Sequence, residues 1–211
     1  MPLIRDAKAV TFVVFDMDDV LYDFDHELRI AALERLTGRG RETFEHAIWH
    51  SGWETAAEAG DPATPEAYLA GFAERLGYPI DAPTWMSIRA AMMRPRPAAL
   101  VLANAAAEQA DAALLTNNGM MLKQALPVCA PEMLDIFGEK AHVSAEFGAR
   151  KPDPAVFLRL CERYGHDPRQ TFFVDDRLEN IEGAEAAGLI AHLYETPDGL
   201  RKAMRALDFE V

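Results

Sequence analysis

The chain of 211 residues has few cysteines, a shortage of basic residues and no long apolar run. Its two cysteines, Cys129 and Cys161, lack CxxC spacing and are too few for a disulfide scaffold. They are predicted to be reduced thiols of a cytoplasmic protein, and a single bridge between them stays open. The alanine-rich stretch at 98–115 contains four polar side chains, so it cannot span a bilayer and no membrane contact is expected.

Basic charge is the second shortage. The 21 lysines and arginines face 34 aspartates and glutamates, which gives a formal net charge of −13. Nonspecific nucleic-acid binding depends on clustered basic side chains, so we expect no nucleic-acid partner. The same net charge repels an anionic ligand, which would need a bound cation and local basic groups. Residues 1–8 carry both signs of charge and no apolar segment, so no signal peptide is predicted.

The order of expected elements favours an α/β fold with one core and one insertion. After residue 96, apolar segments alternate with helical ones, and the last expected strand ends at Leu193. This alternation is typical of a parallel, Rossmann-like sheet with helices on both faces. Residues from about 25 to 93 show helical patterning and no evident strand. We therefore predict an α/β core of residues 1–22 and 96–211, with an all-helical insertion at 23–95.

Two aspartates follow the first apolar segment. Val10–Phe15 is predicted to be a buried strand, because it is rich in β-branched and aromatic residues and carries no charge. Asp16 and Asp18 are two positions apart, so they project together from the carboxyl end of the strand, where open α/β sheets hold ligands. Carboxylates this close repel each other unless a cation intervenes. The pair indicates a metal, a general acid or both, and the alternative is a solvated acidic turn.

Further polar residues recur at the same place in the expected fold. Thr116-Asn117 and Asp175-Asp176 each follow directly on a short apolar segment, and Lys151 stands in a proline-containing loop before an expected helix. In a parallel sheet, the ends of neighbouring strands share one edge. Each cluster alone could be an ordinary turn, a helix cap or a surface lysine. Their coincidence at one edge favours a functional site.

These clusters resemble the four motifs of the haloacid dehalogenase superfamily, in order and over nearly the whole chain. The motifs are Asp16-Met17-Asp18, Thr116-Asn117-Asn118, Lys151-Pro152-Asp153 and Phe173-Val174-Asp175-Asp176. The helical insertion is similar to the cap subdomain of the branch with a helical first insertion. Residues 174–184 look most like the sugar-phosphate phosphatases that act on glucose 1-phosphate.

The resemblance implies a Mg²⁺-dependent phosphatase that hydrolyses a small phosphomonoester through an aspartyl-phosphate. Asp16 would be the nucleophile, and Asp18 would protonate the leaving group and then deprotonate water. Mg²⁺ would be held by Asp16, the backbone carbonyl of Asp18 and Asp176. Asp175 stands where many relatives carry glycine, and it is expected to support a ligand or to bind the metal through water. Asp19, where glycine is also usual, is expected to form local hydrogen bonds in the turn.

Three further residues are expected at the phosphoryl group. Thr116 and the backbone amide of Asn117 would hold its oxygens, and Lys151 would neutralise Asp16 and the phosphate together. The resemblance also implies that the cap closes over the site and supplies specificity. The candidates in and beside the cap are Tyr22, His26, Trp49, His50, Trp53 and Arg94.

Other functions compete with the phosphatase. A phosphomutase would return the phosphoryl group to a sugar, and the motifs barely distinguish the two. A 2-haloacid dehalogenase needs neither a metal nor a second acid, so Asp18 and the Asp175-Asp176 pair count against it. A non-catalytic binding protein on this fold is disfavoured by the complete catalytic set. The sequence names neither the ester nor the oligomeric state, and a monomer and a homodimer are both compatible with it.

Overall fold

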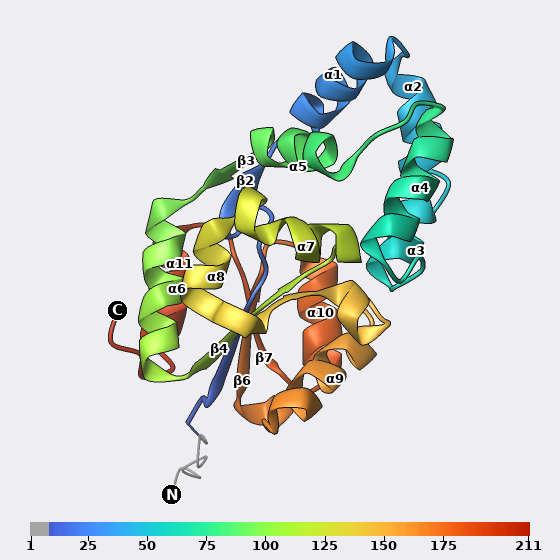
Figure 1. Ribbon diagram of the computed structural model, residues 1–211. Coiled ribbons are helices and arrows are strands. Elements are labelled where there is room, and N and C mark those ends of the chain that lie inside the picture. Colours follow the sequence, from blue (N-terminus) through green and yellow to red (C-terminus); the bar gives the residue numbers. More distant parts are fainter. Residues whose placement is uncertain (1–8) are drawn as a thin grey trace, which may run out of the picture.

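The computed structural model describes residues 9–211, so the expectation for a signal peptide at residues 1–8 lies outside the described residues. The chain forms a five-stranded sheet with the order β5-β4-β1-β6-β7, in which all neighbouring strands run parallel (Figure 1). The strands are β1 (Phe12–Phe15), β4 (Asp111–Thr116), β5 (Ala141–Val143), β6 (Thr171–Asp175) and β7 (Ile190–Leu193). The predicted α/β fold is confirmed.

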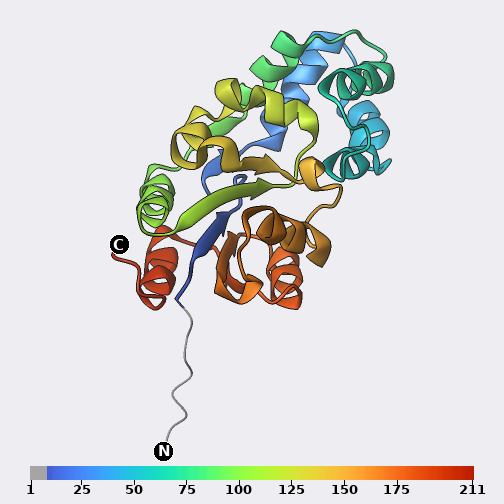
Figure 2. The same ribbon diagram turned by 60° about the horizontal axis from the view of Figure 1, so that its bottom comes forward.

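Successive residues of the central strand β1 enter two different apolar clusters. Val13 and Phe15 belong to one cluster, and Phe12 and Val14 to the other, and all four are fully buried. The first cluster includes helices α6 (Pro97–Gln109), α7 (Met120–Cys129), α8 (Pro131–Phe137) and α11 (Pro197–Arg205). The second includes α9 (Pro154–Tyr164) and α10 (Leu178–Ala186). Figure 2 shows these two layers of helices with the sheet between them. Each buried side chain of this size stabilises the fold by roughly 1.5–3 kcal/mol.

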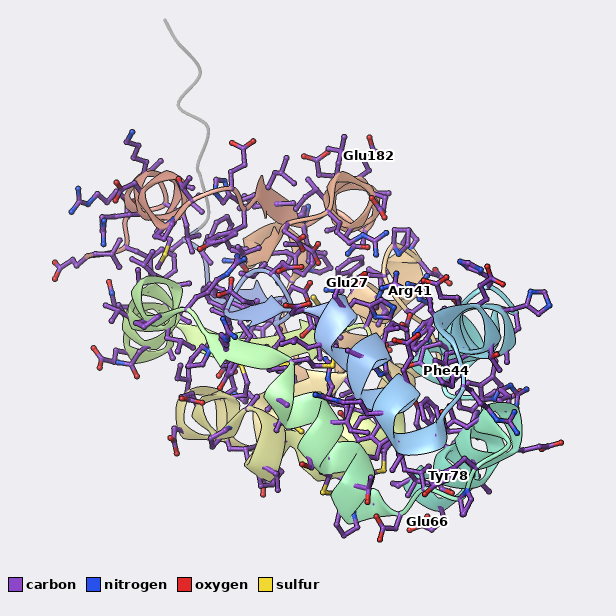
Figure 3. The ribbon with its side chains drawn as sticks, turned by 90° about the horizontal axis from the view of Figure 1, so that it is seen from above. Glu27, Arg41, Phe44, Glu66, Tyr78 and Glu182 are labelled. Carbon is purple, nitrogen blue, oxygen red and sulfur yellow. The ribbon has the colours of Figure 1, made fainter. Side chains whose placement is uncertain are left out.

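The segment at 25–92 is almost entirely helical, as predicted, and is called the cap from here on. It comprises α1 (His26–Thr37), α2 (Arg41–Phe44), the π-helical turn η1 (Glu45–Trp49), α3 (Trp53–Glu58), α4 (Pro65–Leu76) and α5 (Ala82–Ala91). Helices α4 and α5 begin where the capping signals indicate, because Thr64 and Asp81 each accept a hydrogen bond from the first turn. Seen from above, the buried Phe44 lies among these helices and Glu66 lies at the rim (Figure 3).

Two short strands join the cap to the core. β2 (Tyr22–Phe24) and β3 (Met93–Pro95) pair as an antiparallel ribbon, with Tyr22 opposite Pro95 and Phe24 opposite Met93. Because the predicted boundaries at 22/23 and 95/96 fall inside or at the end of this ribbon, the division into two domains stays a prediction. The paired strands give the cap one common attachment.

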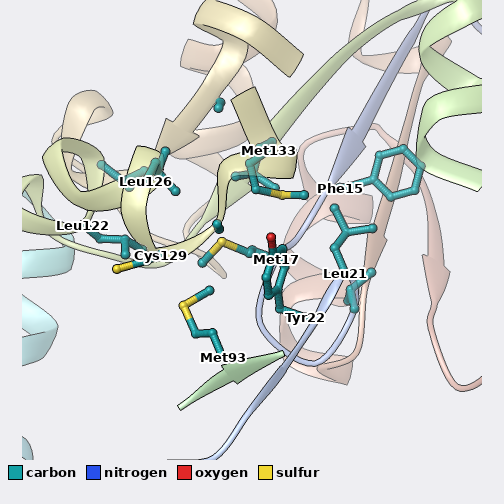
Figure 4. Packing of buried hydrophobic residues seen from close by; sticks show 14 of the residues in the cluster. Phe15, Met17, Leu21, Tyr22, Met93, Leu122, Leu126, Cys129 and Met133 are labelled. Atoms are coloured by element: carbon teal, nitrogen blue, oxygen red, sulfur yellow. The ribbon is translucent and has the colours of Figure 1, made fainter. Parts of the chain in front are cut away.

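The apolar core is continuous from the sheet into the cap. Met17, Tyr22 and Met93 pack near Leu122 and Met133 of helices α7 and α8 (Figure 4). Helix α7 also contacts α4 and α5 of the cap. Both cysteines are buried and free, which excludes the bridge between them. Among helices within residues 9–211, none combines the length and the apolarity needed to cross a membrane.

Candidate active site

A cavity of about 420 Å³ lies where the carboxyl ends of the strands face the cap. Six of the seven residues predicted for the site line it. They are Asp16, Asp18, Thr116, Asn117, Lys151 and Asp176. Asp175, the seventh, is fully buried and contacts Lys151. The sheet therefore brings four stretches of sequence, separated by up to 160 positions, to one place.

Lys151 is the central cation of the core side. Its side chain is 1% exposed, and its Nζ lies 2.8 Å from Asp16 Oδ1 and 2.6 Å from Asp175 Oδ2. Burial alone would lower the pKa of Lys151, but the two carboxylates outweigh burial and raise it. The ammonium is therefore charged at neutral pH. It counters Asp16 and can also meet an incoming anion.

The carboxylates around Lys151 carry more negative charge than this one ammonium neutralises. Burial raises the pKa of Asp16 well above its usual value despite Lys151, and Asp175 and Asp18 raise it further. Burial, together with Asp175, also raises the pKa of Asp176. Asp16 Oδ1 has an ion pair but no hydrogen bond, which leaves a buried oxygen only partly satisfied.

This arrangement fits a hard divalent cation. One carboxylate oxygen each from Asp16, Asp175 and Asp176 lies within 4.8 Å of the other two. Oxygen donors of this kind suit Mg²⁺, and a cation among them would offset the mutual repulsion that burial intensifies. The donor set therefore fits the metal that the sequence motifs imply.

The contacts of Asp175 are occupied by protein groups. Its Oδ1 accepts hydrogen bonds from the Arg177 amide at 2.9 Å and from Asn180 Nδ2 at 2.9 Å. Its Oδ2 accepts from Lys151 Nζ at 2.6 Å and from Asn180 Nδ2 at 3.0 Å. A carboxylate used in this way orients Lys151. Asn180, which the sequence analysis missed, in turn orients Asp175.

Asn117 also positions Lys151. The Asn117 side chain donates to the Lys151 carbonyl oxygen at 2.8 Å and accepts from the Lys151 amide at 2.9 Å. Thr116 Oγ1 accepts from Asn118 Nδ2 at 2.9 Å. The sequence analysis assigned only the backbone amide of Asn117 to the site. The reciprocal pair of hydrogen bonds shows that its side chain ties the strand end of β4 to the lysine loop.

The turn after Asp18 has an unusual backbone. Asp19 has φ of 60°, in the left-handed region that favours glycine. Its Oδ1 accepts from the Phe24 amide at 3.4 Å, and Arg96 contacts both its carbonyl oxygen and its carboxylate. The expected local hydrogen bonding of Asp19 is confirmed. These hydrogen bonds stabilise an aspartate at a position whose left-handed backbone favours glycine.

The cap supplies the opposite wall of the cavity. Arg89 Nη2 lies 2.8 Å and 3.1 Å from the two carboxylate oxygens of Asp18. Arg29 pairs with Glu54 at 3.6 Å, and Glu58 pairs with Arg150 of the core at 2.6 Å. Burial raises the pKa of Glu58, although Arg150 opposes the change.

The expectations for the cap were only partly right. His26 and Trp49 line the cavity, and the other four candidates do not. Trp53 instead packs on Tyr68 and Phe72, and the Tyr22 hydroxyl bonds to Glu132. Arg29 and Arg89 were missed, because nothing in their local sequence separates them from surface arginines on a helix.

Comparisons with known proteins agree with this geometry. A family profile described as haloacid dehalogenase-like hydrolase matches residues 10–188. The chain belongs to this family. It is 26% identical to phosphatase MT3486 of Mycobacterium tuberculosis over 94% of this chain and 95% of that protein. It is 25% identical to glyceraldehyde 3-phosphate phosphatase of Methanopyrus kandleri, over 84% of this chain and 81% of that one.

A solved structure of the family shares the fold. A HAD family enzyme of Bacteroides thetaiotaomicron, in complex with magnesium and inorganic phosphate, superposes with a TM-score of 0.73. The two chains are 23% identical, and the match covers 88% of this chain and 94% of the other. At this identity, the likeness establishes the common architecture of core and cap.

Proposed function

We propose that the protein is a Mg²⁺-dependent phosphatase that hydrolyses a small phosphomonoester through an aspartyl-phosphate. The observation that carries the proposal is the placement of Lys151 between Asp16 and Asp175 on the floor of a cavity that Asp18 and Asp176 also line. Two relatives named as phosphatases, and the magnesium and phosphate held by the Bacteroides enzyme, support it.

The residues divide the chemistry between them. Asp16 attacks phosphorus, the bond from phosphorus to the ester oxygen breaks, and Asp18 gives its proton to the departing alkoxide. Asp18 then takes a proton from water, which attacks phosphorus and releases Asp16. Thr116, the Asn117 amide and Lys151 hold the phosphoryl oxygens in line for both steps.

The metal would be held by Asp16, the Asp18 carbonyl and Asp176. When bound, Mg²⁺ supplies positive charge to the phosphoryl oxygens and to the nucleophile. We assign Asp175 a supporting role, because Lys151, Asn180 and the Arg177 amide already use its oxygens. The metal and Lys151 would also offset the repulsion that a net charge of −13 exerts on an anionic substrate.

The size of the cavity restricts the substrate. A volume of about 420 Å³, roofed by the cap, accepts a phosphate with a leaving group of metabolite size.

The proposal is tested by phosphate release from a panel of esters with Mg²⁺ present. The panel includes 4-nitrophenyl phosphate, glucose 1-phosphate, glyceraldehyde 3-phosphate, glycolate phosphate, a nucleoside monophosphate and flavin mononucleotide. We expect turnover that EDTA abolishes and Mg²⁺ restores. Asp16→Asn should abolish it, whereas Asp135→Asn, an exposed aspartate on α8, should not.

Two results would contradict the proposal. Turnover that persists in Asp16→Asn would remove this residue as nucleophile, and turnover in EDTA would remove the metal. Conversion of a sugar phosphate into its isomer, without release of phosphate, would instead identify a phosphomutase.

A further inference from the structure

Arg89 is the cap residue that touches the proposed acid and base. It lies in the last turn of α5, its side chain is 3% exposed, and its Nη2 bonds to both oxygens of Asp18. The Asp18 side chain is 25% exposed to the cavity. Among the described residues, no other side chain forms a hydrogen bond or ion pair with the Asp18 carboxylate. Without Arg89, the Asp18 side chain would be free to change rotamer.

Arg89 is itself held in place from two sides. Its guanidinium lies over the Phe24 ring, 4.4 Å from the ring centroid. Phe24 pairs with Met93, four residues after Arg89, and the Asp25 amide donates to the Met92 carbonyl at 2.9 Å. The strand ribbon therefore fixes the arginine relative to the turn that carries Asp18.

We propose that Arg89 is a positioning residue that holds the Asp18 carboxylate beside the departing oxygen of the substrate. The inference rests on the proposed phosphatase function. Arg89 Nη2 donates to both oxygens of Asp18. When one of these oxygens carries a proton, the other still accepts the hydrogen bond, so the contact can persist while Asp18 acts as acid and while it acts as base. Arg89 thereby makes the placement of a core residue depend on the cap.

The bonding of Arg89 argues against a purely structural role. Its Nε is buried and has no partner, which costs stability. Arg29, by contrast, has its carboxylate partner, Glu54, inside the cap. Among the residues that the structure describes, Asp18 supplies the one carboxylate that Arg89 contacts, and it belongs to the core and to the proposed reaction. An apolar side chain of similar length would fill the same space without burying an unpaired N–H.

The experiment compares two esters in variants of Arg89. 4-Nitrophenolate leaves without needing a proton, whereas an alkoxide needs one from Asp18. We expect Arg89→Gln to lower kcat/KM, which reports formation of the aspartyl-phosphate, by about tenfold to a hundredfold on an alkyl phosphate and by less than about threefold on 4-nitrophenyl phosphate. Arg89→Lys should recover part of the loss, because it keeps the charge without the planar fork. Arg35→Gln, on an exposed face of α1, is the matched control and should change neither rate.

A second comparison uses Asp18→Asn as background. If Arg89 acts through Asp18, adding Arg89→Gln to Asp18→Asn should cost almost nothing further on the alkyl ester. A full additional loss in that background would overturn the proposal, as would equal losses of kcat/KM on both esters or a change confined to KM. Turnover of the aryl ester shows that a variant is folded, and the Lys variant provides the same ratio if the Gln variant is not.

The two proposals fail in different ways. A wild-type protein that releases phosphate from no ester would end both. A wild-type protein that is active, with Arg89 variants that lose both esters alike, would end only the assignment of Arg89.

Discussion

The core and the cap both bury charged side chains against one cavity, but they satisfy them differently. On the core side, Asp16 and Asp175 share one ammonium, and the pKa of Asp16 stays raised by burial. In the cap, Arg29 has its own carboxylate, Glu54, and lies against aromatic rings, 5.0 Å from the centroid of Trp49 and 5.6 Å from that of Phe72. The core charges still need a ligand, whereas those around Arg29 need none.

Arg29 keeps its charge although its side chain is buried in the cap. Burial alone would lower the pKa of Arg29, but Glu54 and Tyr68 outweigh burial and raise it. The charge is thus retained inside an aromatic cluster and forms part of the roof. A floor whose carboxylates outnumber its one buried ammonium, and a roof that is already neutralised, suit a site that captures an anion and a cation together.

The largest test of this difference is Lys151→Ala. It leaves Asp16 and Asp175 buried without their shared cation, and we expect kcat/KM to fall by about a hundredfold to a thousandfold. Loss of one partner from a buried ion pair also costs about 3–5 kcal/mol of stability. Saturating Mg²⁺ should restore part of the free energy of unfolding in urea, because the metal replaces some of the missing charge.

The control for this change is Lys202→Ala, at an exposed position of α11. It should leave both activity and stability unchanged. If Lys151→Ala behaved like the control, the ammonium would not be the group that neutralises the core carboxylates, and the contrast between core and cap would disappear.

The residues on the core side of the site could be predicted because the position of a strand end in the fold follows from the sequence. Asp16, Thr116 and Asp176 each follow an apolar segment that becomes a central strand, and a parallel sheet brings such ends to one edge. The conspicuous misses lie on helices. Asn180 on α10 and Arg89 on α5 reach the site through helix packing, which leaves no mark in their local sequence.

Helix α11 and strands β2 and β3 escaped the sequence analysis for different reasons. Helix α11 is rich in polar residues and follows the last expected strand, although Thr196 before Pro197 is a usable start signal, and Thr196 does accept from the Gly199 amide. Strands β2 and β3 have three residues each, which is too short for a periodic pattern. Their pairing depends on residues about 70 positions apart in sequence.

A smaller effect is expected from Arg29→Met in the cap. Met fills the space between the rings but leaves Glu54 without its cation. We therefore expect the free energy of unfolding to fall by about 2 kcal/mol. Amide hydrogen exchange should accelerate in α1 and α4 and change little in the strands of the core. Arg35→Met, an exposed change on the same helix, should have no effect.

A second change in the cap sharpens this result. Glu54→Gln, added to Arg29→Met, should return part of the lost stability, because no unpaired charge then remains. If amide exchange accelerated as much in the core strands as in the cap helices, the two regions would unfold as one unit. The stabilisation by Arg29 would then not be confined to the cap.

A third group of charged side chains, outside the lining of the cavity, gives the smallest test. Glu146 accepts from the Val143 amide at 2.9 Å and contacts His142 Nδ1 at 3.1 Å and Lys123 Nζ at 3.3 Å. Burial alone would raise the pKa of Glu146, but His142 and the Val143 amide, with Lys123, outweigh burial and lower it from 4.5. This cluster is part of the core, yet it is satisfied without a ligand, like the charges around Arg29.

The expected pH dependence follows from the direction of that pKa. Because the pKa of Glu146 is lower in the folded protein than in the unfolded one, its ionisation stabilises the fold above pH 4.5, and the contribution is lost as pH falls through the lower, folded value. Glu146→Gln should therefore reduce the free energy of unfolding by about 1 kcal/mol at neutral pH and by less in acid. Urea unfolding of both proteins from neutral pH down into the acid range measures this difference. If the difference in the free energy of unfolding between the two proteins grew as the pH fell, the Glu146 carboxylate would be strained in the fold. The partners of a charged side chain would then not be enough to tell a satisfied charge from an unsatisfied one.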